Sequence, residues 1–523
     1  MAELLHELIF ETAQDMPERE ALVYQKSRLS YRELAAGVSG VAGTLLGLGL
    51  AKSERVAVYL EKRIETVTAM FGASAAGGVF VPVNPILKAE QVAYILKDCN
   101  VRILVTSADR LKLLSESLQD CRDLHTVLVV GEPGGTPVLP GLDVLRWDGA
   151  MRDGGKGHRV INSDMAAILY TSGSTGKPKG VVLSHLNMVA GAKSVAQYLE
   201  NTMEDRILSV LPLSFDYGFS QLTTAFHVGA TAVLMNYLLP RDIVRAVEKE
   251  RITGLAAVPP LWIQLAQLEW PVDTQLRYFT NSGGAMPLST LKDLRARFPN
   301  ASPYLMYGLT EAFRSTYLPP EEVDRRPDSI GQAIPSAEIM VVREDGSPCA
   351  PGEPGELVHR GVLVSLGYWN DHEKTAERFK PAPNRESGLT MAEMAVWSGD
   401  TVRADEEGYL YFISRRDEMI KTSGYRVSPT EVEEVIYATG MAGEVAAVGV
   451  PHEMLGQAIV VIVAAREGLS LDVDALMAEC RQRLPAYMVP NEIRPYPGSL
   501  PRNPNGKMDR KLLLNEILNS WRA

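Results

Sequence analysis

The sequence predicts an α/β protein built on parallel sheets, and three observations support this fold class. Short apolar runs alternate with helical patterns through residues 1–300, and strands that alternate with helices form parallel sheets covered on both faces. Several of these runs end in loops rich in Gly, Pro and Ser, as expected where loops leave the carboxyl edge of a sheet. At 523 residues the chain is too long for one core, and a domain size of roughly 100–200 residues predicts about three or four units.

Local signals place the N-terminal elements. Ser30 precedes a helical pattern and Glu33 completes a capping box, which predicts a helix that begins just after Ser30. Val56 to Leu60 and Val79 to Val83 are apolar and short, and Pro85 ends the second run, so both are predicted to be buried strands. This region has the pattern of a scaffold and carries little chemistry of its own.

Three later apolar runs end in loops of small or aromatic residues. They are Leu208 to Leu211, Gly254 to Val258 and Leu276 to Thr280. A fourth run, from Tyr304, leads directly into the segment YGLTE. Loops at the carboxyl ends of parallel strands meet at one edge of the sheet, where ligands bind, so a pocket is expected there.

Composition limits the class of partner and the compartment. The net charge of −11 argues against nucleic acid as a partner, although a nucleotide needs only local positive charge. The four cysteines are scattered and form no CxxC pair, which favours a reducing cytoplasm. The N-terminus has acidic residues where a signal peptide would carry basic ones, and no apolar run approaches roughly 18 residues, so no integral membrane segment is expected.

The most informative stretch is Tyr170 to Gly180, YTSGSTGKPKG, which follows an apolar run. Its glycines allow close backbone approach, and its hydroxyls, backbone N–H groups and lysines favour an anion such as phosphate. It is not a Walker loop, because only Ser174 and Thr175 separate Gly173 from Gly176. It is not a nucleophile elbow either, because no serine in it has glycine two residues away on both sides. A flexible Gly/Ser surface loop remains the alternative for the bare composition.

This stretch resembles the phosphate loop of the AMP-forming acyl-CoA synthetases, a superfamily that also contains luciferases and the adenylation domains of peptide synthetases. A fainter resemblance is to ligases found beside bacterial exosortase systems. The resemblance implies a large N-terminal domain, residues 1–416, with two parallel-type αβαβα sheets and a small β-barrel-like subdomain. It also implies a small mobile α+β domain, residues 417–523, that turns about a hinge at Asp417.

Other segments continue the series of motifs. In YGLTE the resemblance makes Tyr307 the adenine platform, and it makes Glu311 a ligand of Mg²⁺, a cation that prefers oxygen ligands. Asp400 is implied to hold both ribose hydroxyls, since a carboxylate has two acceptor oxygens. Lys507, in a loop rich in Pro and Gly, is implied to bridge the substrate carboxylate and the α-phosphate. The catalytic residues are therefore expected to be Lys507, Thr310 and Glu311, with Thr171 as a second candidate metal ligand. The residues expected to bind ATP or AMP are Thr171, Ser172, Gly173, Ser174, Thr175, Gly176, Lys177, Gly283, Gly284, Ala285, Met306, Tyr307, Gly308, Thr310, Asp400, Phe412, Arg415 and Lys507.

The acid is less defined than the nucleotide. The substrate pocket is expected from Phe215, Asp216, Tyr217, Gly218, Gly283 and Gly308. A buried carboxylate needs a cation or a donor, so Asp216 in the pocket would indicate a polar acid, with an amino-substituted acid like those of the peptide synthetases as one candidate. Asp216 bonded to local backbone is the alternative. For the second step the resemblance points to Asp417, Gly424 and Arg426, with Gly424 leaving room for a thiol. Ser414 departs from the glycine that the family has before Arg415.

Three functions are open from the sequence. The first is a ligase that joins a small-molecule carboxylic acid to coenzyme A, using ATP and Mg²⁺. The second is a stand-alone adenylation enzyme that loads a separate carrier protein. The third is a non-catalytic nucleotide-binding or scaffold protein, which the joint presence of Lys507, Glu311 and Asp400 argues against. A monomer and a homodimer both remain open.

Overall fold

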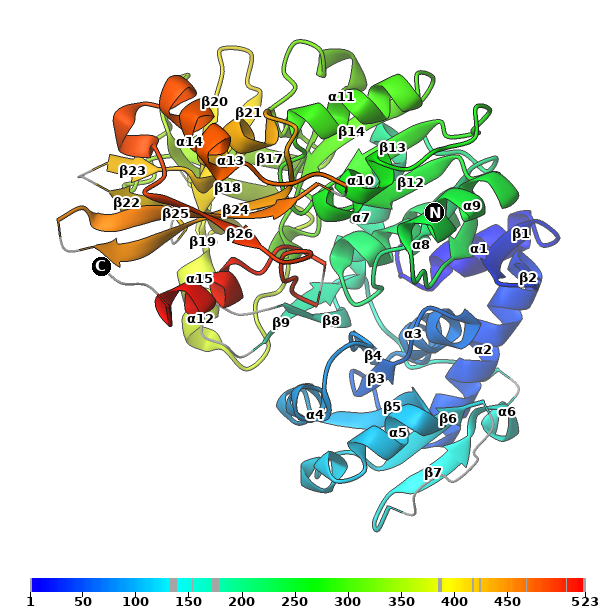
Figure 1. The fold of residues 1–523 in the computed structure, drawn as a ribbon. Helices are drawn as coiled ribbons and strands as arrows, with labels where there is room; N and C mark the ends of the chain where they lie inside the picture. Colours follow the sequence, from blue (N-terminus) through cyan, green and yellow to red (C-terminus); the bar gives the residue numbers. More distant parts are fainter. Residues whose placement is uncertain are drawn as a thin grey trace.

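The computed structural model describes most of the chain, and its sheets divide it into lobes (Figure 1). The described residues are 2–131, 139–152, 154–171, 178–383, 388–415, 418–422, 425–452, 454–466, 468–504 and 506–520. Within them no helix is both long and apolar enough to cross a bilayer.

A seven-stranded sheet forms the lower lobe in Figure 1. Its strands, in spatial order, are β7 (Asp143–Arg146), β6 (Thr126–Val130), β5 (Val101–Ser107), β3 (Arg55–Tyr59), β4 (Val79–Pro82), β8 (Met165–Thr171) and β9 (Lys179–Ser184). All neighbours pair in parallel except β8 and β9, which form an antiparallel hairpin. On one face lie α4 (Ala89–Asp98) and α5 (Ala108–Leu114), whose apolar residues pack on β3, β5 and β6. The short helix α6 (Trp147–Ala150) follows β7.

A nine-stranded sheet forms the second lobe. Its spatial order is β16 (Gln332–Ala333), β15 (Thr316–Leu318), β14 (Ser302–Tyr307), β13 (Tyr278–Asn281), β12 (Gly254–Ala257), β10 (Arg206–Ser209), β11 (Thr231–Leu234), β1 (Glu20–Tyr24) and β2 (Ser27–Ser30). The strands from β1 to β14 in this order are parallel, and the edge strands are antiparallel. Its helices are α1 (Glu7–Asp15), α7 (His185–Tyr198), α8 (Asp216–Val228), α9 (Pro240–Lys249), α10 (Pro259–Ala266) and α11 (Leu288–Arg297).

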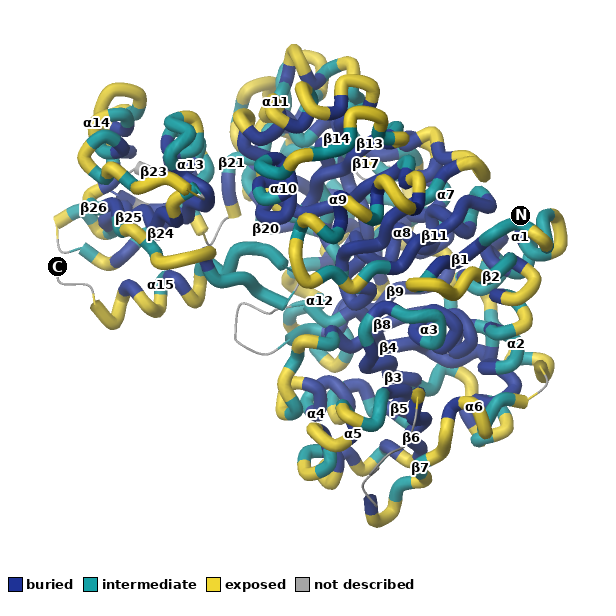
Figure 2. The backbone as a smooth tube through the Cα atoms, turned by 45° about the vertical axis from the view of Figure 1, so that its right-hand side comes forward, coloured by how far each residue is buried: buried dark blue, intermediate teal, exposed yellow. Residues whose placement is uncertain are grey.

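Helices from both lobes meet in one apolar core. The helix α2 (Tyr31–Gly47) begins with the predicted capping box of Ser30 and Glu33, and it packs on α3 (Ile64–Ala76). Phe71 of α3 stacks on Phe219 of α8, with 5.8 Å between ring centroids. This buried layer fixes the two sheets against each other, and the backbone between them is almost wholly buried (Figure 2).

Two smaller sheets complete the chain. The first contains β17 (Ala337–Val342), β18 (Gly355–Gly361), β19 (Phe379–Pro381), β20 (Met394–Ala404) and β21 (Leu410–Arg415), with the short helix α12 (His372–Arg378) beside it. The second contains β22 (Ile420–Thr422), β23 (Tyr425–Val427), β24 (Ala442–His452), β25 (Gly456–Ala465) and β26 (Glu492–Tyr496). It carries α13 (Pro429–Tyr437), α14 (Val473–Arg483) and α15 (Arg510–Leu518).

The predicted fold class is confirmed: two mostly parallel sheets, a small antiparallel sheet and a small C-terminal α+β unit. The predicted strands at Val56 and Val79 are present, although boundaries differ by one or two residues. The largest difference is at β10, which ends at Ser209, two residues before the predicted end at Leu211. The predicted limits of the two domains, 1–416 and 417–523, stay a prediction.

Candidate active site

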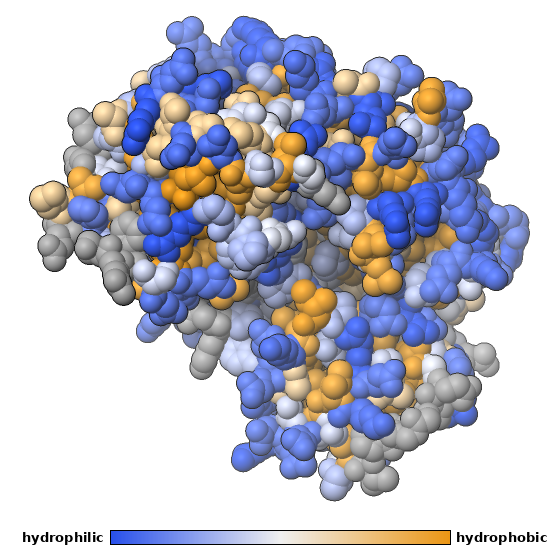
Figure 3. All heavy atoms as spheres, viewed as in Figure 1, coloured by the Kyte–Doolittle hydropathy of each residue, from blue (hydrophilic) through white to orange (hydrophobic). Residues whose placement is uncertain are grey.

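A cavity of about 1760 Å³ lies where the carboxyl ends of the strands, the small antiparallel sheet and the C-terminal unit meet. In the space-filling view this face is hollowed between the lower lobe and the parts above it (Figure 3). The expected residues that line the cavity are Thr171, Phe215, Asp216, Gly283, Gly284, Ala285, Met306, Tyr307, Gly308, Thr310, Glu311, Asp400, Phe412, Arg415 and Lys507. Residues far apart in the chain are thus brought together, as the sequence predicted.

Some expected residues lie outside the described part of the chain. These are Ser172, Gly173, Ser174, Thr175, Gly176 and Lys177 of the loop, together with Asp417, Gly424 and the side chain of Arg426. The two ends of the loop are described. Thr171 ends β8, Lys179 begins β9 opposite it, and both line the cavity.

Lys507 reaches into the middle of the cavity from a tight turn. The backbone N–H of Asn503 donates to the carbonyl of Lys507 at 2.7 Å, and the Asn503 side chain accepts from the Lys507 N–H at 3.0 Å. The lysine stem passes over Gly283, where an added Cβ would lie 2.8 Å from Lys507 Cε. Its Nζ lies 5.2 Å from the ring centroid of Phe215. The φ of +85° favours glycine at 283, and the missing side chain leaves room for the lysine stem.

Burial and several charged neighbours change the pKa of Lys507. Burial lowers its pKa, and the nearby guanidinium of Arg415 acts in the same direction. The carboxylates of Asp216 and Asp400 act in the opposite direction and favour the ammonium form. Lys507 is thus a cation on which both aspartates of the site act.

Asp400 is held in β20 at the open end of the site. Pairing of β20 with β21 places Arg415 opposite Asp400, with 3.4 Å between Arg415 Nε and Asp400 Oδ1. The Tyr307 hydroxyl donates to Asp400 Oδ2 at 2.5 Å, and the ring of Tyr307 lies 6.2 Å from that of Phe412. Burial raises the pKa of Asp400, since it disfavours the charged form. Two aromatic rings beside a buried carboxylate can take a base and a ribose.

Asp216 has an internal partner that the sequence analysis missed. Arg314 is fully buried and places Nη1 3.4 Å from Asp216 Oδ2, while Thr310 donates to Asp216 Oδ1 at 3.2 Å. Arg314 also donates to Ser220 at 2.9 Å and lies 4.5 Å over the ring of Tyr217. Asp216 therefore meets a cation and a hydroxyl, not local backbone. An arginine in the otherwise apolar and small run AFRST was the available signal.

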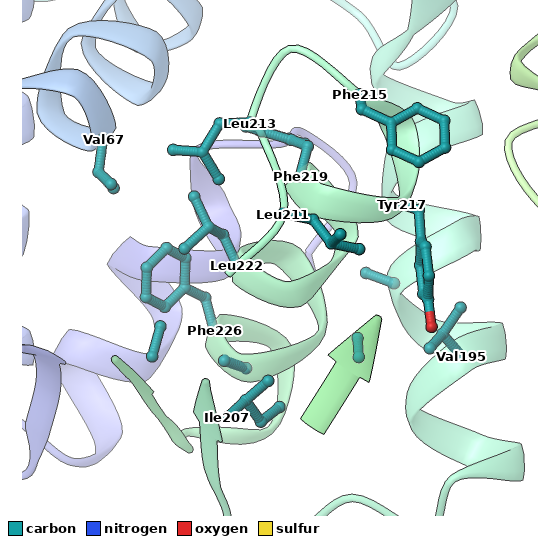
Figure 4. Packing of buried hydrophobic residues seen from close by; sticks show 14 of the residues in the cluster. Val67, Val195, Ile207, Leu211, Leu213, Phe215, Tyr217, Phe219, Leu222 and Phe226 are labelled. Carbon is teal, nitrogen blue, oxygen red and sulfur yellow. The ribbon is translucent and has the colours of Figure 1, made fainter. Parts of the chain in front are cut away.

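Tyr217 and Gly218, which were expected in the substrate pocket, do not line the cavity. Both are in the first turn of α8, where successive residues point about 100° apart, so only Asp216 of the three faces the site. Tyr217 lies among buried side chains next to Val195 of α7 (Figure 4), and its hydroxyl bonds to the Thr280 hydroxyl at 2.5 Å. A Cβ on Gly218 would lie 2.0 Å from the carbonyl oxygen of Pro212, which explains the glycine by packing alone.

Glu311 is in a short 3-10 turn, Thr310–Ala312, that follows β14. The hydroxyl of Tyr368 donates to Glu311 Oε1 at 2.5 Å. No group of three or more metal-ligating side chains occurs among residues that the structure describes. A single carboxylate beside a cavity for a polyphosphate nevertheless fits Mg²⁺, which usually takes one or two carboxylates plus phosphate oxygens.

The arrangement can bring two anions together. The cavity that contains Glu311 is also lined by three cations, Lys507, Arg415 and Lys179. Cations fixed in such a site offset the electrostatic repulsion between a carboxylate and a phosphate. The aromatic pair and Asp400 lie at one end, and the buried pair of Asp216 and Arg314 lies at the other. This geometry suits transfer between a nucleotide and an organic acid.

Comparison with known proteins agrees with this geometry. The chain matches the AMP-binding enzyme family over residues 9–369 and the AMP-binding enzyme C-terminal domain over residues 431–507. The L-proline–[L-prolyl-carrier protein] ligase of Pseudomonas fluorescens is 31% identical, over 98% of this chain and 99% of that protein. A long-chain-fatty-acid–CoA ligase of Salmonella typhimurium is 29% identical, over 98% of this chain and 94% of that protein.

A solved structure agrees as well. The o-succinylbenzoate coenzyme A synthetase of Bacillus subtilis, in complex with ATP and magnesium ion, superposes with a TM-score of 0.82 at 25% identity, and the match covers 98% of this chain and 99% of that chain. The resemblance found in the sequence is confirmed at the level of the superfamily, and this chain belongs to the AMP-binding enzyme family as an adenylate-forming ligase.

Proposed function

We propose that this chain joins a small polar carboxylic acid to the AMP part of ATP and passes the acyl group to a phosphopantetheine thiol. The observation that carries the proposal is the position of Lys507, which lies over Gly283 and Phe215 with Asp216 and Asp400 near its ammonium. A carboxylate placed at Lys507 would face the α-phosphate of a nucleotide whose ribose is bound at Asp400.

The first step needs no proton transfer. A carboxylate oxygen bonds to the α-phosphorus, the bond from phosphorus to the oxygen bridging the β-phosphate breaks, and its electron pair leaves with pyrophosphate. In the proposal Tyr307 and Phe412 take the adenine, Asp400 accepts from the ribose hydroxyls, and Lys507 bridges the reacting anions. Mg²⁺, when bound at Glu311, would supply positive charge to the phosphate oxygens.

In the second step the thiol sulfur bonds to the acyl carbon, the bond to AMP breaks, and the thiol proton is released to solvent. The residues proposed for this step are Asp417, as a hinge between domains 1–416 and 417–523, with Gly424 and Arg426. Withdrawal of the Lys507 turn would open the site to the thiol, and motion of a domain on a short hinge is a common way to do this.

The acid is proposed to carry a hydrogen-bonding group. Asp216 and Arg314 are both buried at the acyl end and form a neutral pair, so a plain hydrocarbon tail would leave their remaining donors and acceptors unsatisfied. Arg314 Nε has no hydrogen-bond partner among the described residues. An amino-substituted acid remains a candidate, and similarity to a prolyl-carrier protein ligase favours it.

Two acceptors are supported by different relatives. Coenzyme A is the first candidate, in line with the two CoA ligases above. A separate carrier protein is the second, in line with the L-prolyl-carrier protein ligase, which is similar over 99% of its length. The resemblance to exosortase-associated ligases stays a prediction.

An exchange assay would test the first step. Labelled pyrophosphate is incubated with ATP, Mg²⁺ and one acid from a panel of aliphatic, aryl, hydroxy and amino acids that includes L-proline. We expect acid-dependent incorporation of label into ATP, strongest for small polar acids. No exchange with any acid would favour the scaffold alternative, and equal exchange with plain aliphatic acids and amino acids would contradict the role of Asp216.

The acceptor follows from a second assay. With the best acid, AMP release is measured with coenzyme A or with a phosphopantetheinylated carrier protein. Thioester formation on coenzyme A alone supports the first candidate, and formation on the carrier alone supports the second.

A further inference from the structure

A group of cations other than Lys507 lies near Glu311. Lys179 Nζ lies 5.1 Å from the ring centroid of Tyr368, the residue whose hydroxyl donates to Glu311. Arg378, the last residue of α12, and Lys374 of the same helix line the cavity beside them. None of these cations belongs to a motif of the sequence analysis except Lys179.

We call the part of the cavity that carries Lys179, Lys374 and Arg378 the cationic wall. Hydrogen bonds join the segments that form it. Residues 366–369 run antiparallel to β9, with the Val182 N–H donating to Gly367 at 2.9 Å and the Trp369 N–H to Gly180 at 2.7 Å. The Tyr368 N–H donates to the Thr375 hydroxyl at 3.0 Å, which joins α12 to the same segment. Figures 1 and 2 both show α12 beside the β8–β9 hairpin.

Arg378 interacts with both Glu311, the proposed metal ligand, and Asp400, the proposed ribose ligand. Its Nη1 donates to the Trp397 carbonyl at 3.0 Å, and a Cβ added to Gly399 would lie 2.6 Å from the same atom. Gly399 directly precedes Asp400 and has a φ of +69°. A nucleotide with its ribose at Asp400 and its metal at Glu311 must carry its phosphates past this guanidinium.

Three cations, Lys179, Lys374 and Arg378, are grouped on this side of the cavity. Burial, then repulsion from Lys374 and Arg378, lowers the pKa of Lys179, so the three cations act on one another. Burial alone would lower the pKa of Arg378, but Glu311, Tyr368 and Asp400 together raise it above its ordinary value. Asp371 also acts on Lys179, Asp400 acts on Arg378, and Glu377 of α12 lines the cavity, so these cations have several carboxylate neighbours. Three cations grouped beside Glu311, the proposed metal ligand, are nevertheless suited to a polyanion that arrives with Mg²⁺.

We propose that Arg378, with Lys179 and Lys374, binds the two outer phosphates of ATP and holds pyrophosphate as it leaves. This subsite is separate from Lys507, which serves the α-phosphate and the acid. The inference rests on the proposed adenylate formation and adds the residues that take the leaving group.

Calorimetric titration of magnesium pyrophosphate and of AMP into the full-length protein tests the subsite. The variant Arg378→Met keeps the length of the side chain and removes its charge. We expect pyrophosphate to bind roughly 10–100-fold more weakly and AMP to change by less than about 2-fold, because charge-assisted hydrogen bonds to the outer phosphates are lost. Arg378→Lys should recover part of the loss, since a point charge replaces a planar fork.

Lys292→Met is the matched control. Lys292 lies in α11, is exposed and is not among the residues that line the cavity, so removing its charge should change neither affinity by more than about 2-fold. Lys374→Met, on the outer part of the wall, should weaken pyrophosphate by about 3–10-fold and leave AMP unchanged, and it tests the subsite if Arg378→Met does not fold.

Two results would overturn the inference. Equal weakening of AMP and pyrophosphate in Arg378→Met would show a structural role, and unchanged pyrophosphate affinity in both variants would place the outer phosphates elsewhere. In either case acid-dependent exchange by the wild-type protein would leave the proposed function standing. Failure of the wild-type protein to bind ATP and to exchange would instead refute the proposed function itself.

Discussion

Two buried aspartates at opposite ends of one cavity have arginine partners at the same distance but in different surroundings. Asp216 lies 3.4 Å from Arg314, and the two side chains are 4% and 2% exposed. Asp400 also lies 3.4 Å from its arginine, but the side chain of Arg415 is 52% exposed. The first pair is buried in the wall of the cavity, and the second has an arginine that is accessible to a ligand.

The difference in exposure suggests different roles: the Asp216–Arg314 pair contributes to the stability of the fold, and the Asp400–Arg415 pair to ligand binding. Burial raises the pKa of both aspartates, so each carboxylate depends on its neighbours to remain charged. At Asp216 those neighbours are fixed protein groups, and the pair completes the acyl end of the cavity. At Asp400 the Tyr307 hydroxyl and a half-exposed guanidinium leave room for hydroxyl donors from a nucleotide.

The largest difference is expected in stability. Asp216→Asn leaves Arg314 buried without a counter-ion, and we expect the free energy of unfolding to fall by about 3–5 kcal/mol. Asp400→Asn should change it by only about 1 kcal/mol or less, because Arg415 can be solvated. Urea denaturation followed by tryptophan fluorescence measures both variants under one set of conditions.

The double variant Asp216→Leu/Arg314→Met provides the control. Replacing both charges by apolar side chains of similar volume should recover most of the lost stability, because no unpaired charge remains buried. If Asp400→Asn lowers the free energy of unfolding as much as Asp216→Asn does, the distinction between the buried pair and the partly exposed pair is contradicted.

The second largest effect is expected on the rate of adenylate formation, when Lys507, on which both aspartates act, is replaced. Lys507→Ala should reduce adenylate formation by roughly 10²- to 10³-fold, as removal of one preorganised charge typically does. Thioester formation from supplied acyl-adenylate should stay close to the wild-type rate, because the proposed thiol step does not use this lysine. Pyrophosphate exchange and single-turnover thioester formation measure the two steps, and an equal loss in both would contradict the two-step proposal.

Much of the site could be predicted because its residues lie in motifs of fixed order. Glu311 and Lys507 lie in turns and Asp400 lies in β20, each with distinctive neighbours in sequence, and the structure brings all three to the cavity. The alternation of strands and helices was sufficient for the parallel sheets, and the capping box at Ser30 for the start of α2.

The site residues that the sequence did not predict depend on tertiary contacts, which local sequence patterns do not specify. Arg314 and Arg378 are single arginines in ordinary runs, and only the fold brings the first to Asp216 and the second near Glu311. Tyr217 was misplaced for a related reason: the sequence presents FDYG as one loop, whereas α8 begins at Asp216 and turns the next residue into the core. Neighbours in sequence share a surface in a loop but not in a helix.

The smallest expected effect is a dependence on pH that only the partly exposed pair should show. Because burial raises the pKa of Asp400 above 3.8, its carboxylate protonates at a higher pH than an exposed aspartate. Ribose hydroxyls need the ionised form as acceptor, so affinity is present above the folded-state pKa and falls up to about tenfold per pH unit below it. Adenosine is the suitable probe, because it has no phosphate that titrates in the same range. Its binding between neutral and mildly acidic pH should weaken in the wild-type protein and in Arg378→Met, whereas Asp400→Asn should bind more weakly at neutral pH and show no such dependence. A pH dependence that persists in Asp400→Asn would assign the titration to another group and would remove Asp400 from the ribose site.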